Sequence, residues 1–197
     1  MNPGVGGDKL KHDSRDIALT AIFAALYAVL LLLLYNLSFG LVQVRIADAL
    51  IPLSAIFGWP AVVGVTLGCL IGNVISPMPS VIVDMSVGAL ANFAASFLAW
   101  KITVQKRDSM ISEFLGCTTA TVVITFIVGT YLAVLTGMEL WIWWLSIFTG
   151  SLISINLVGY STLQLMKKAG LKVGYMNRSS LVNPIISSKS KFNASNT

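Results

Sequence analysis

The chain has 197 residues, of which 56% are hydrophobic and only 11% are charged, and its mean hydropathy is +0.82. This composition excludes a soluble globular domain and predicts an integral membrane protein. The formal net charge is +5, but the basic residues cluster at the ends of apolar stretches, which argues against a nucleic-acid-binding surface.

Long uncharged stretches fill most of the chain between residues 16 and 168, and each is close to or beyond the length that crosses a bilayer as a helix. No cleavable signal peptide is expected, because the first apolar stretch is too long and no small-residue cleavage site follows it. The polar segments 1–15 and 169–197 are expected to be poorly ordered cytoplasmic tails. We therefore predict an all-α membrane bundle over 16–168, with six transmembrane helices at about 16–36, 45–57, 60–76, 80–100, 111–135 and 139–167.

The second predicted helix, 45–57, is the shortest of the six. It would rise only about 20 Å, against a hydrocarbon core of roughly 30 Å, and Pro52 lies within it. The sequence FGWP at 57–60 nevertheless supplies the turn that a separate span requires, because Gly58 is permissive and Pro60 starts a helix well.

The distribution of basic residues favours six spans with both termini in the cytoplasm. This topology leaves only Arg45 on the outer side, where the loops would be 36–44, 76–80 and 136–140. It places the following basic groups in the cytoplasm: Lys9, Lys11, Arg15, Lys101, Lys106, Arg107, Lys167, Lys168 and the basic C-terminal tail.

Four charged residues remain on the outer side of this topology, namely Arg45, Asp48, Asp84 and Glu139. Ionisable groups at or inside a membrane normally pair, face a wet cavity or contact a ligand. Arg45 and Asp48 are three residues apart and are therefore possible partners on a helix. A local ion pair that orients the first loop and a direct ligand contact are both open interpretations.

The fourth predicted helix carries Asp84, Gly88, Asn92 and Ser96 at intervals of four residues, so these residues share one face. This face carries a charged residue at its outer end and small residues beyond it. It is suited to a close helix contact in which Asn92 is hydrogen-bonded across helices, or to the wall of a ligand site.

The sixth predicted helix begins with MELWIWWLSIF. Its tryptophans are typical of an aromatic belt at the membrane interface, but Trp141 or Trp144 could also stack on a flat ligand. Deeper in the same helix lie neutral groups that donate and accept hydrogen bonds, namely Ser151, Ser154 and Asn156. Such a lining favours a small heterocycle over an ion.

The first predicted helix has the small-xxx-small spacing that lets helices approach closely, at Ala21, Ala24, Ala25 and Ala28. Packing within the chain's own bundle and docking onto another membrane subunit are both open.

The chain has no P-loop spacing, no HExxH motif and no nucleophile with a nearby base. We therefore expect no enzymatic activity, no cofactor and no metal site. The two cysteines, Cys69 and Cys117, lie in apolar stretches and are interpreted as packing residues.

Three segments in order, VRIADALIPL, GCLIGNVIS and DMSVGALANFAASFLAW, resemble the QueT family of queuosine-precursor transporters, over roughly residues 16–168. Members are substrate-binding S components of energy-coupling factor (ECF) transporters. The resemblance implies six helices and substrate capture near the first loop and the outer halves of helices four to six. It also implies docking of the alanine motif on a transmembrane coupling subunit, with two P-loop ATPases supplying energy.

Two positions depart from the family pattern. Asp48 stands where the family usually has Glu, and Ser151 stands where the last helix of the family usually has Glu. A cationic precursor such as an aminomethyl deazaguanine would need a buried carboxylate partner. The change at Ser151 weakens the case for that substrate and leaves a neutral deazapurine, or another heterocycle, open.

The sequence thus predicts an S component in the cytoplasmic membrane that binds a deazaguanine-like metabolite. Asp84 and Asn92 are expected to hydrogen-bond the heterocycle, and Arg45 with Asp48 to fix the first loop. The further candidates for substrate binding are Glu139, Trp141, Trp144, Ser151 and Asn156. The alternatives are a membrane scaffold without a ligand of its own, or a self-sufficient secondary carrier.

Overall fold

The computed structural model describes residues 14–40, 43–105 and 109–173, and the regular structure within these ranges is entirely helical. Most of the two expected tails lies outside the described residues. The same is true of Lys9 and Lys11, and of Lys106 and Arg107 in the loop after the fourth predicted helix.

The helical elements follow the predicted segments closely, and three of the segments contain an unexpected winding: η1 and η2 are 3₁₀ helices and η3 is a π-helix. In chain order they are α1 (Ser14–Leu33), α2 (Tyr35–Ser38), η1 (Ile46–Leu53), α3 (Ser54–Phe57), α4 (Trp59–Gly72), η2 (Asn73–Ile75), α5 (Val81–Gln105), α6 (Met110–Thr136), α7 (Leu140–Ser151), η3 (Leu152–Gly159) and α8 (Tyr160–Lys168).

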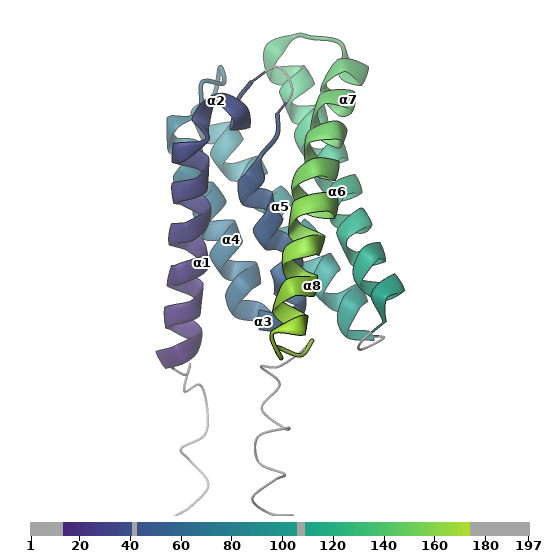
Figure 1. Ribbon diagram of the computed structural model, residues 1–197. Helices are drawn as coiled ribbons and strands as arrows, with labels where there is room; N and C mark the ends of the chain where they lie inside the picture. The colour runs from purple at the N-terminus through teal and green to yellow at the C-terminus, as the bar shows by residue number, and fades with distance from the viewer. Residues whose placement is uncertain (1–13, 41–42, 106–108, 174–197) are drawn as a thin grey trace, which may run out of the picture.

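The elements form a bundle whose segments run alternately in opposite directions (Figure 1). α1, α4 and α6 run upward in Figure 1, whereas η1 with α3, then α5, and finally α7 with η3 and α8 run downward. The start of α1 and the end of α8 therefore lie at the same end of the bundle. We call this the lower end and the opposite one the upper end.

Within the described residues, four helices are long and apolar enough to cross a membrane, and they are Ser14–Leu33, Val81–Gln105, Met110–Thr136 and Leu140–Lys168. The segments Ile46–Phe57 and Trp59–Ile75 are apolar but shorter. The prediction of a helical membrane bundle is confirmed, whereas only four of its six segments reach spanning length.

The second segment was expected to be an α-helix, but η1 is wound as a 3₁₀ helix with Pro52 inside it. A 3₁₀ helix rises about 2.0 Å per residue, against about 1.5 Å for an α-helix, so the same residues reach further. The turn predicted at 57–60 is present, since Gly58 has a φ of 63° and Pro60 lies in the first turn of α4.

The basic residues that the structure describes are distributed unevenly between the two ends. Arg15 lies at the start of α1, Lys101 lies near the end of α5, and Lys167 with Lys168 ends α8, all at the lower end. Arg45, just before η1, is the exception. The positive-inside rule associates such a distribution with a cytoplasmic lower end.

Glycines on α4 bring that helix unusually close to α1. A Cβ atom added at Gly64 would lie 2.4 Å from Phe23 Cβ, and one at Gly68 would lie 2.6 Å from Tyr27 Cβ. Real side chains do not approach so closely. Larger residues at these two positions would therefore push the helices apart and move Tyr27 outward.

This contact divides the four alanines of α1 into two pairs. Ala24 and Ala28 are buried on the side that carries Tyr27, whereas Ala21 and Ala25 are exposed. The first pair packs within the bundle, and only the second pair is accessible to another protein.

Candidate functional site

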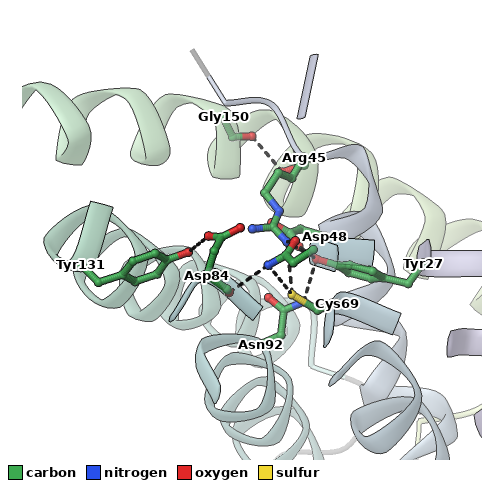
Figure 2. A network of polar contacts seen from close by, with 10 residues as sticks. Tyr27, Arg45, Asp48, Cys69, Asp84, Asn92, Tyr131 and Gly150 are labelled. Atoms are coloured by element: carbon green, nitrogen blue, oxygen red, sulfur yellow. Dashed lines mark hydrogen bonds and ion pairs between the residues drawn. The ribbon is translucent and has the colours of Figure 1, made fainter. Parts of the chain in front are cut away.

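Polar side chains from five separate segments of the bundle meet in its upper half, where α1 and α6 end and α5 begins (Figure 2). Most of them are fully buried. We call this set the polar cluster, and it consists of Tyr27, Arg45, Asp48, Cys69, Asn73, Asp84, Asn92 and Tyr131.

Arg45 enters the polar cluster from the extended segment before η1, and only 5% of its surface is exposed. Its Nη2 atom donates to Cys69 Sγ and Asn73 Oδ1, both at 3.2 Å, and to the hydroxyl of Tyr27 at 3.3 Å. Its Nε atom lies 4.0 Å from Asp48 Oδ2. The predicted pairing of Arg45 with Asp48 is present, and the guanidinium additionally ties the segment before η1 to α1 and α4.

Tyr27 connects both charges of this pair to α5. Its hydroxyl donates to Asp48 Oδ1 and accepts a 2.7 Å hydrogen bond from Asn92 Nδ2. Asn92 is therefore hydrogen-bonded across helices, as one of the two interpretations of its helix face predicted. Because Tyr27 is fully buried, its hydroxyl requires these partners.

Asp84 lies on the opposite side of the polar cluster and is 2% exposed. Its Oδ1 accepts a hydrogen bond from the hydroxyl of Tyr131 on α6, and its backbone carbonyl accepts one from Asn73 Nδ2 at 3.1 Å. Its Oδ2 has no hydrogen-bond partner within the described protein. This oxygen is an acceptor that remains open for a ligand.

The small residue one turn after Asp84 makes room for the amide of Asn73. A Cβ atom at Gly88 would lie 2.7 Å from Asn73 Nδ2. Ser96, two turns further along the same face, is buried and donates to the backbone carbonyl of Asn92. The predicted polar face of this helix thus points into the bundle.

Buried polar atoms usually have partners, so those without one are positions that a ligand or an ordered water can complete. Among the described residues, the unpartnered buried side-chain atoms are Ser38 Oγ, Gln43 Nε2, Arg45 Nε and Asp84 Oδ2. Two of them belong to the polar cluster, and Gln43 lies two residues before Arg45. All four belong to segments in the upper half of the bundle.

The last helix positions the segment that carries Arg45. A Cβ atom at Gly150 would lie only 1.8 Å from the carbonyl oxygen of Gln43, and the backbone N–H of Gln43 donates to Ser146 Oγ at 3.3 Å. At the lower end of η3, a Cβ at Gly159 would lie 2.9 Å from the carbonyl oxygen of Ala49. These two glycines let α7 and η3 pack directly against the backbone before and within η1.

Three further candidates lie outside the polar cluster. Glu139 is exposed at the start of α7, and Trp141 is 63% exposed. Trp144 packs on Gly129 and donates from Nε1 to Thr130, both on α6. The structure therefore does not bring these side chains to Asp84 and Asn92, because their positions on α7 turn them toward α6 or away from the bundle.

The two deeper candidates of the last helix also remain apart from the polar cluster. Ser151 is buried beside Gly150, and within the described residues no hydrogen bond joins it to the polar cluster. Asn156 on η3 accepts from Thr121 Oγ1 at 2.6 Å and donates to Thr118 Oγ1 at 3.2 Å. It therefore links η3 to the lower half of α6.

Sequence reasoning missed Tyr27, Cys69, Asn73 and Tyr131 as members of this site. Single polar groups within apolar helices give little signal, and Cys69 was interpreted as a packing residue. A weak signal existed at Tyr27, which lies in an apolar helix between Ala24 and Ala28 and whose hydroxyl needs a partner when buried.

A second buried carboxylate lies at the lower end of the bundle. Glu113 on α6 is 1% exposed, and its two oxygens accept from Lys167 Nζ and, at 2.6 Å, from Gln164 Nε2, both on α8. The charge of this carboxylate is balanced by Lys167 and both of its oxygens are hydrogen-bonded. It therefore ties α8 to α6.

The polar cluster contains groups that can bind a ligand reversibly. It offers a carboxylate acceptor at Asp84, an unpartnered donor at Arg45, and amide groups at Asn73 and Asn92. Among the described residues, no three His, Cys, Asp or Glu side chains are grouped so that they could hold a metal ion.

Comparison with known proteins supports a transport role for this bundle. The family described as QueT transporter matches residues 17–168, which include every element from α1 to α8 apart from the first residues of α1. Comparison with the curated proteins and with the solved structures gives no match. The chain belongs to the QueT transporter family, and is thus a membrane transport protein.

Proposed function

We propose that this chain is the substrate-binding S component of an ATP-driven ECF transporter in the cytoplasmic membrane. It would import a small planar metabolite, namely a queuosine-precursor-like deazapurine. Its membership of the QueT transporter family and its helical membrane bundle support this proposal.

The observation that carries the proposal is the polar cluster itself. Three charged side chains, Arg45, Asp48 and Asp84, are almost fully buried in the upper half of an otherwise apolar bundle. Burial of such groups in a membrane protein is costly and is characteristic of substrate pathways and binding sites. The unpartnered atoms of Asp84 and Arg45 provide an acceptor and a donor, which a nitrogen heterocycle can complement.

Within this proposal, Asp84 and Asn92 on α5 hydrogen-bond the ligand, and Arg45 with Asp48 fixes the start of η1. The contacts of Arg45 with Tyr27 and Asn73 support its role in holding that segment. Trp141 and Trp144 are better suited to an aromatic belt at the membrane interface than to stacking on a ligand at the cluster.

The partners in this proposal are a transmembrane coupling subunit and two P-loop ATPases, which supply the energy for transport. The coupling subunit would contact the exposed pair Ala21 and Ala25 on α1. Small residues on an exposed membrane helix allow another helix to approach closely.

This docking can be tested with two matched variants of α1. Ala25→Leu adds bulk to the exposed face and is expected to prevent co-purification of the coupling subunit while leaving the chain stable. Ala24→Leu adds the same bulk beside α4 and is expected to destabilise the fold. Unchanged co-purification of Ala25→Leu with the coupling subunit and both ATPases would contradict docking at this face.

The binding function can be tested by equilibrium titration of the purified chain with 7-deazaguanine derivatives. We expect saturable binding that is lost in Asn92→Ala and retained in Ser86→Ala, because Ser86 is exposed on the same helix. Absence of binding to the unaltered chain at high micromolar ligand would contradict the proposed substrate class.

A further inference from the structure

Four aromatic side chains gather at the lower end of the bundle, where α4 begins and α5 ends (Figure 1). Phe93, Phe97 and Trp100 lie on one face of α5, because they are spaced at intervals of four and three residues. Trp59, in the first turn of α4, packs against all three, with ring centroids 5.8–6.0 Å apart. We call these four residues the aromatic cluster.

The turn between α3 and α4 positions the two tryptophans of the aromatic cluster. Gly58 has a φ of 63°, and a Cβ atom added there would lie 3.5 Å from the indole of Trp100. Trp100 therefore packs directly against the turn, and Trp59 is the next residue along the chain. Because Trp59 is 50% exposed, half of its surface is left uncovered by the described chain.

Lys101 lies at the edge of the aromatic cluster. Its Nζ atom is 5.0 Å from the ring centroid of Trp100 and 5.4 Å from that of Phe97, distances at which a cation is attracted to a ring face. The side chain is exposed, and within the described residues no carboxylate forms an ion pair with it. The rings thus hold the ammonium in place, but no described carboxylate compensates its charge.

The tryptophans at the two ends of the bundle differ in their hydrogen bonds. Trp143 and Trp144, near the upper end, donate their indole N–H groups to threonines of α6. For Trp59 and Trp100, no such acceptor is found in the part of the chain that the structure describes. Since the indole of tryptophan usually finds a hydrogen-bond partner, the aromatic cluster offers two donors beside a cation.

The surface on the other side of Trp59 has a different character. A depression of about 250 Å³ lies there between α1 and α4. Most of its lining is apolar, but it includes the carboxylate of Asp16, which disfavours an anion. Of the two sides of Trp59, the one toward α5 and Lys101 is therefore the better place for a negatively charged group.

Exposed apolar side chains continue from the aromatic cluster toward the upper end. Val63 and Leu67 follow Trp59 at intervals of four residues on α4, and Leu90 precedes Phe93 by three residues on α5. All three aliphatic side chains are exposed. The surface thus joins a cation and hydrogen-bond donors at its lower end to an apolar track above them, which is the distribution of charge and apolar surface along a phospholipid.

We propose that the aromatic cluster and Lys101 bind an anionic phospholipid in the membrane leaflet at the lower end of the bundle. The phosphate of the lipid accepts hydrogen bonds from the ammonium of Lys101 and from an indole N–H, and its acyl chains lie along the exposed side chains of α4 and α5. A negatively charged headgroup is favoured over a zwitterionic one, because the charge of Lys101 is uncompensated. This inference does not depend on the proposed substrate.

The test is native mass spectrometry of the purified full chain in detergent, titrated with phosphatidylglycerol or with phosphatidylcholine of identical acyl chains. We expect about fivefold tighter binding of phosphatidylglycerol, since one basic residue contributes roughly that much at an anionic membrane surface. Lys101→Gln should remove this preference, and Lys101→Arg should retain it. Lys168→Gln is the matched control, because Lys168 is exposed at the same end but lies on α8, and it should leave both affinities unchanged.

A second variant tests the contribution of the indole. Trp59→Phe keeps an aromatic ring against α5 and removes one N–H donor, which phosphates of both lipids can use. It should therefore weaken both lipids by a similar factor and leave the preference for phosphatidylglycerol intact. Unchanged binding of both lipids in Trp59→Phe would exclude this indole from the site.

The remaining outcomes separate a defined lipid site from its alternatives. Equal affinities of the unaltered chain for the two lipids overturn the proposal. A preference that persists in Lys101→Gln, or that falls as much in Lys168→Gln, also overturns it, because the lower end would then attract anions without a defined site. Co-purification of a membrane protein that is lost in Lys101→Gln would assign the surface to a protein instead. None of these results bears on the proposed function.

Discussion

The two ends of the bundle each bury a carboxylate, but only the one at the lower end is complete. Glu113 is held by Lys167 and Gln164, so both of its oxygens are occupied and its charge is balanced. Asp84 is buried to the same degree, yet one of its oxygens is unpartnered and its charge has no counterpart in the described chain. The two carboxylates are thus buried to a similar degree, but only Glu113 has a partner for its charge and for both of its oxygens.

We interpret this difference as that between a structural ion pair at Glu113 and the proposed binding site at Asp84. A complete pair stabilises the contact between α6 and α8 and offers nothing to a ligand. A buried carboxylate without a complete set of partners lowers the stability of the ligand-free protein. A ligand that supplies the missing partner stabilises the folded state when it binds. Substitutions at either end of the bundle alter one side of this contrast at a time.

The largest effect is expected where the balanced pair of the polar cluster is broken. Arg45→Met should lower the free energy of unfolding by about 3–5 kcal/mol, because Asp48 is then buried without a cation. Thermal unfolding in detergent can be followed with a thiol-reactive dye, since Cys69 and Cys117 are both buried. Addition of Asp48→Asn should recover part of the loss, and absence of any recovery would refute the pairing.

Neutralising the two carboxylates is expected to change the free energy of unfolding in different directions. Glu113→Gln should lower the free energy of unfolding by about 1–3 kcal/mol, because a charge-assisted contact with Lys167 is lost. Asp84→Asn should leave the stability unchanged or raise it, because the carboxylate it removes is uncompensated. The same dye assay compares the two variants, and a large loss of stability in Asp84→Asn would show that Asp84 is already compensated.

A steric change on the last helix should disturb the polar cluster indirectly. Gly150→Ala places a methyl group against the carbonyl oxygen of Gln43 and should cost about 1–3 kcal/mol as the segment before Arg45 shifts. Deazapurine affinity should fall as well. Thr149→Ala is the control, since Thr149 is an exposed neighbour. Normal affinity in Gly150→Ala would show that this contact does not position the site.

The smallest effect is expected from the single hydrogen bond on Asp84. Tyr131→Phe removes the donor to Oδ1 and should lower the free energy of unfolding by about 1 kcal/mol. Unfolding of the ligand-free chain measures it. An unchanged free energy of unfolding in Tyr131→Phe would show that this hydrogen bond does not stabilise the ligand-free protein.

The sequence predicted the bundle well, because long apolar stretches and the FGWP turn are local features. Four of the candidates chosen from the sequence, Arg45, Asp48, Asp84 and Asn92, lie together in the polar cluster, since charged or amide groups are conspicuous in apolar helices. The 3₁₀ winding of η1 and the π-helix η3 were not foreseen, because both accompany packing between distant segments around Gly150 and Gly159.

The composition of the site beyond those four residues could not be derived from the sequence. Tyr27, Cys69 and Tyr131 reach the polar cluster only because α1, α4 and α6 converge there. Conversely, Trp141 and Asn156 looked suitable by residue type, but the rotation of the last helix directs them elsewhere. Which side chains of a helix face the polar cluster can be seen only from the three-dimensional arrangement of the helices.

The central claim, that Asp84 is the incomplete carboxylate to which a ligand binds, is tested most directly by calorimetric titration of 7-aminomethyl-7-deazaguanine. The titration compares the unaltered chain with Asp84→Asn and Glu113→Gln. We predict that Asp84→Asn loses the binding although it remains folded, and that Glu113→Gln binds normally although it is less stable. Normal binding by a folded Asp84→Asn variant would contradict the account.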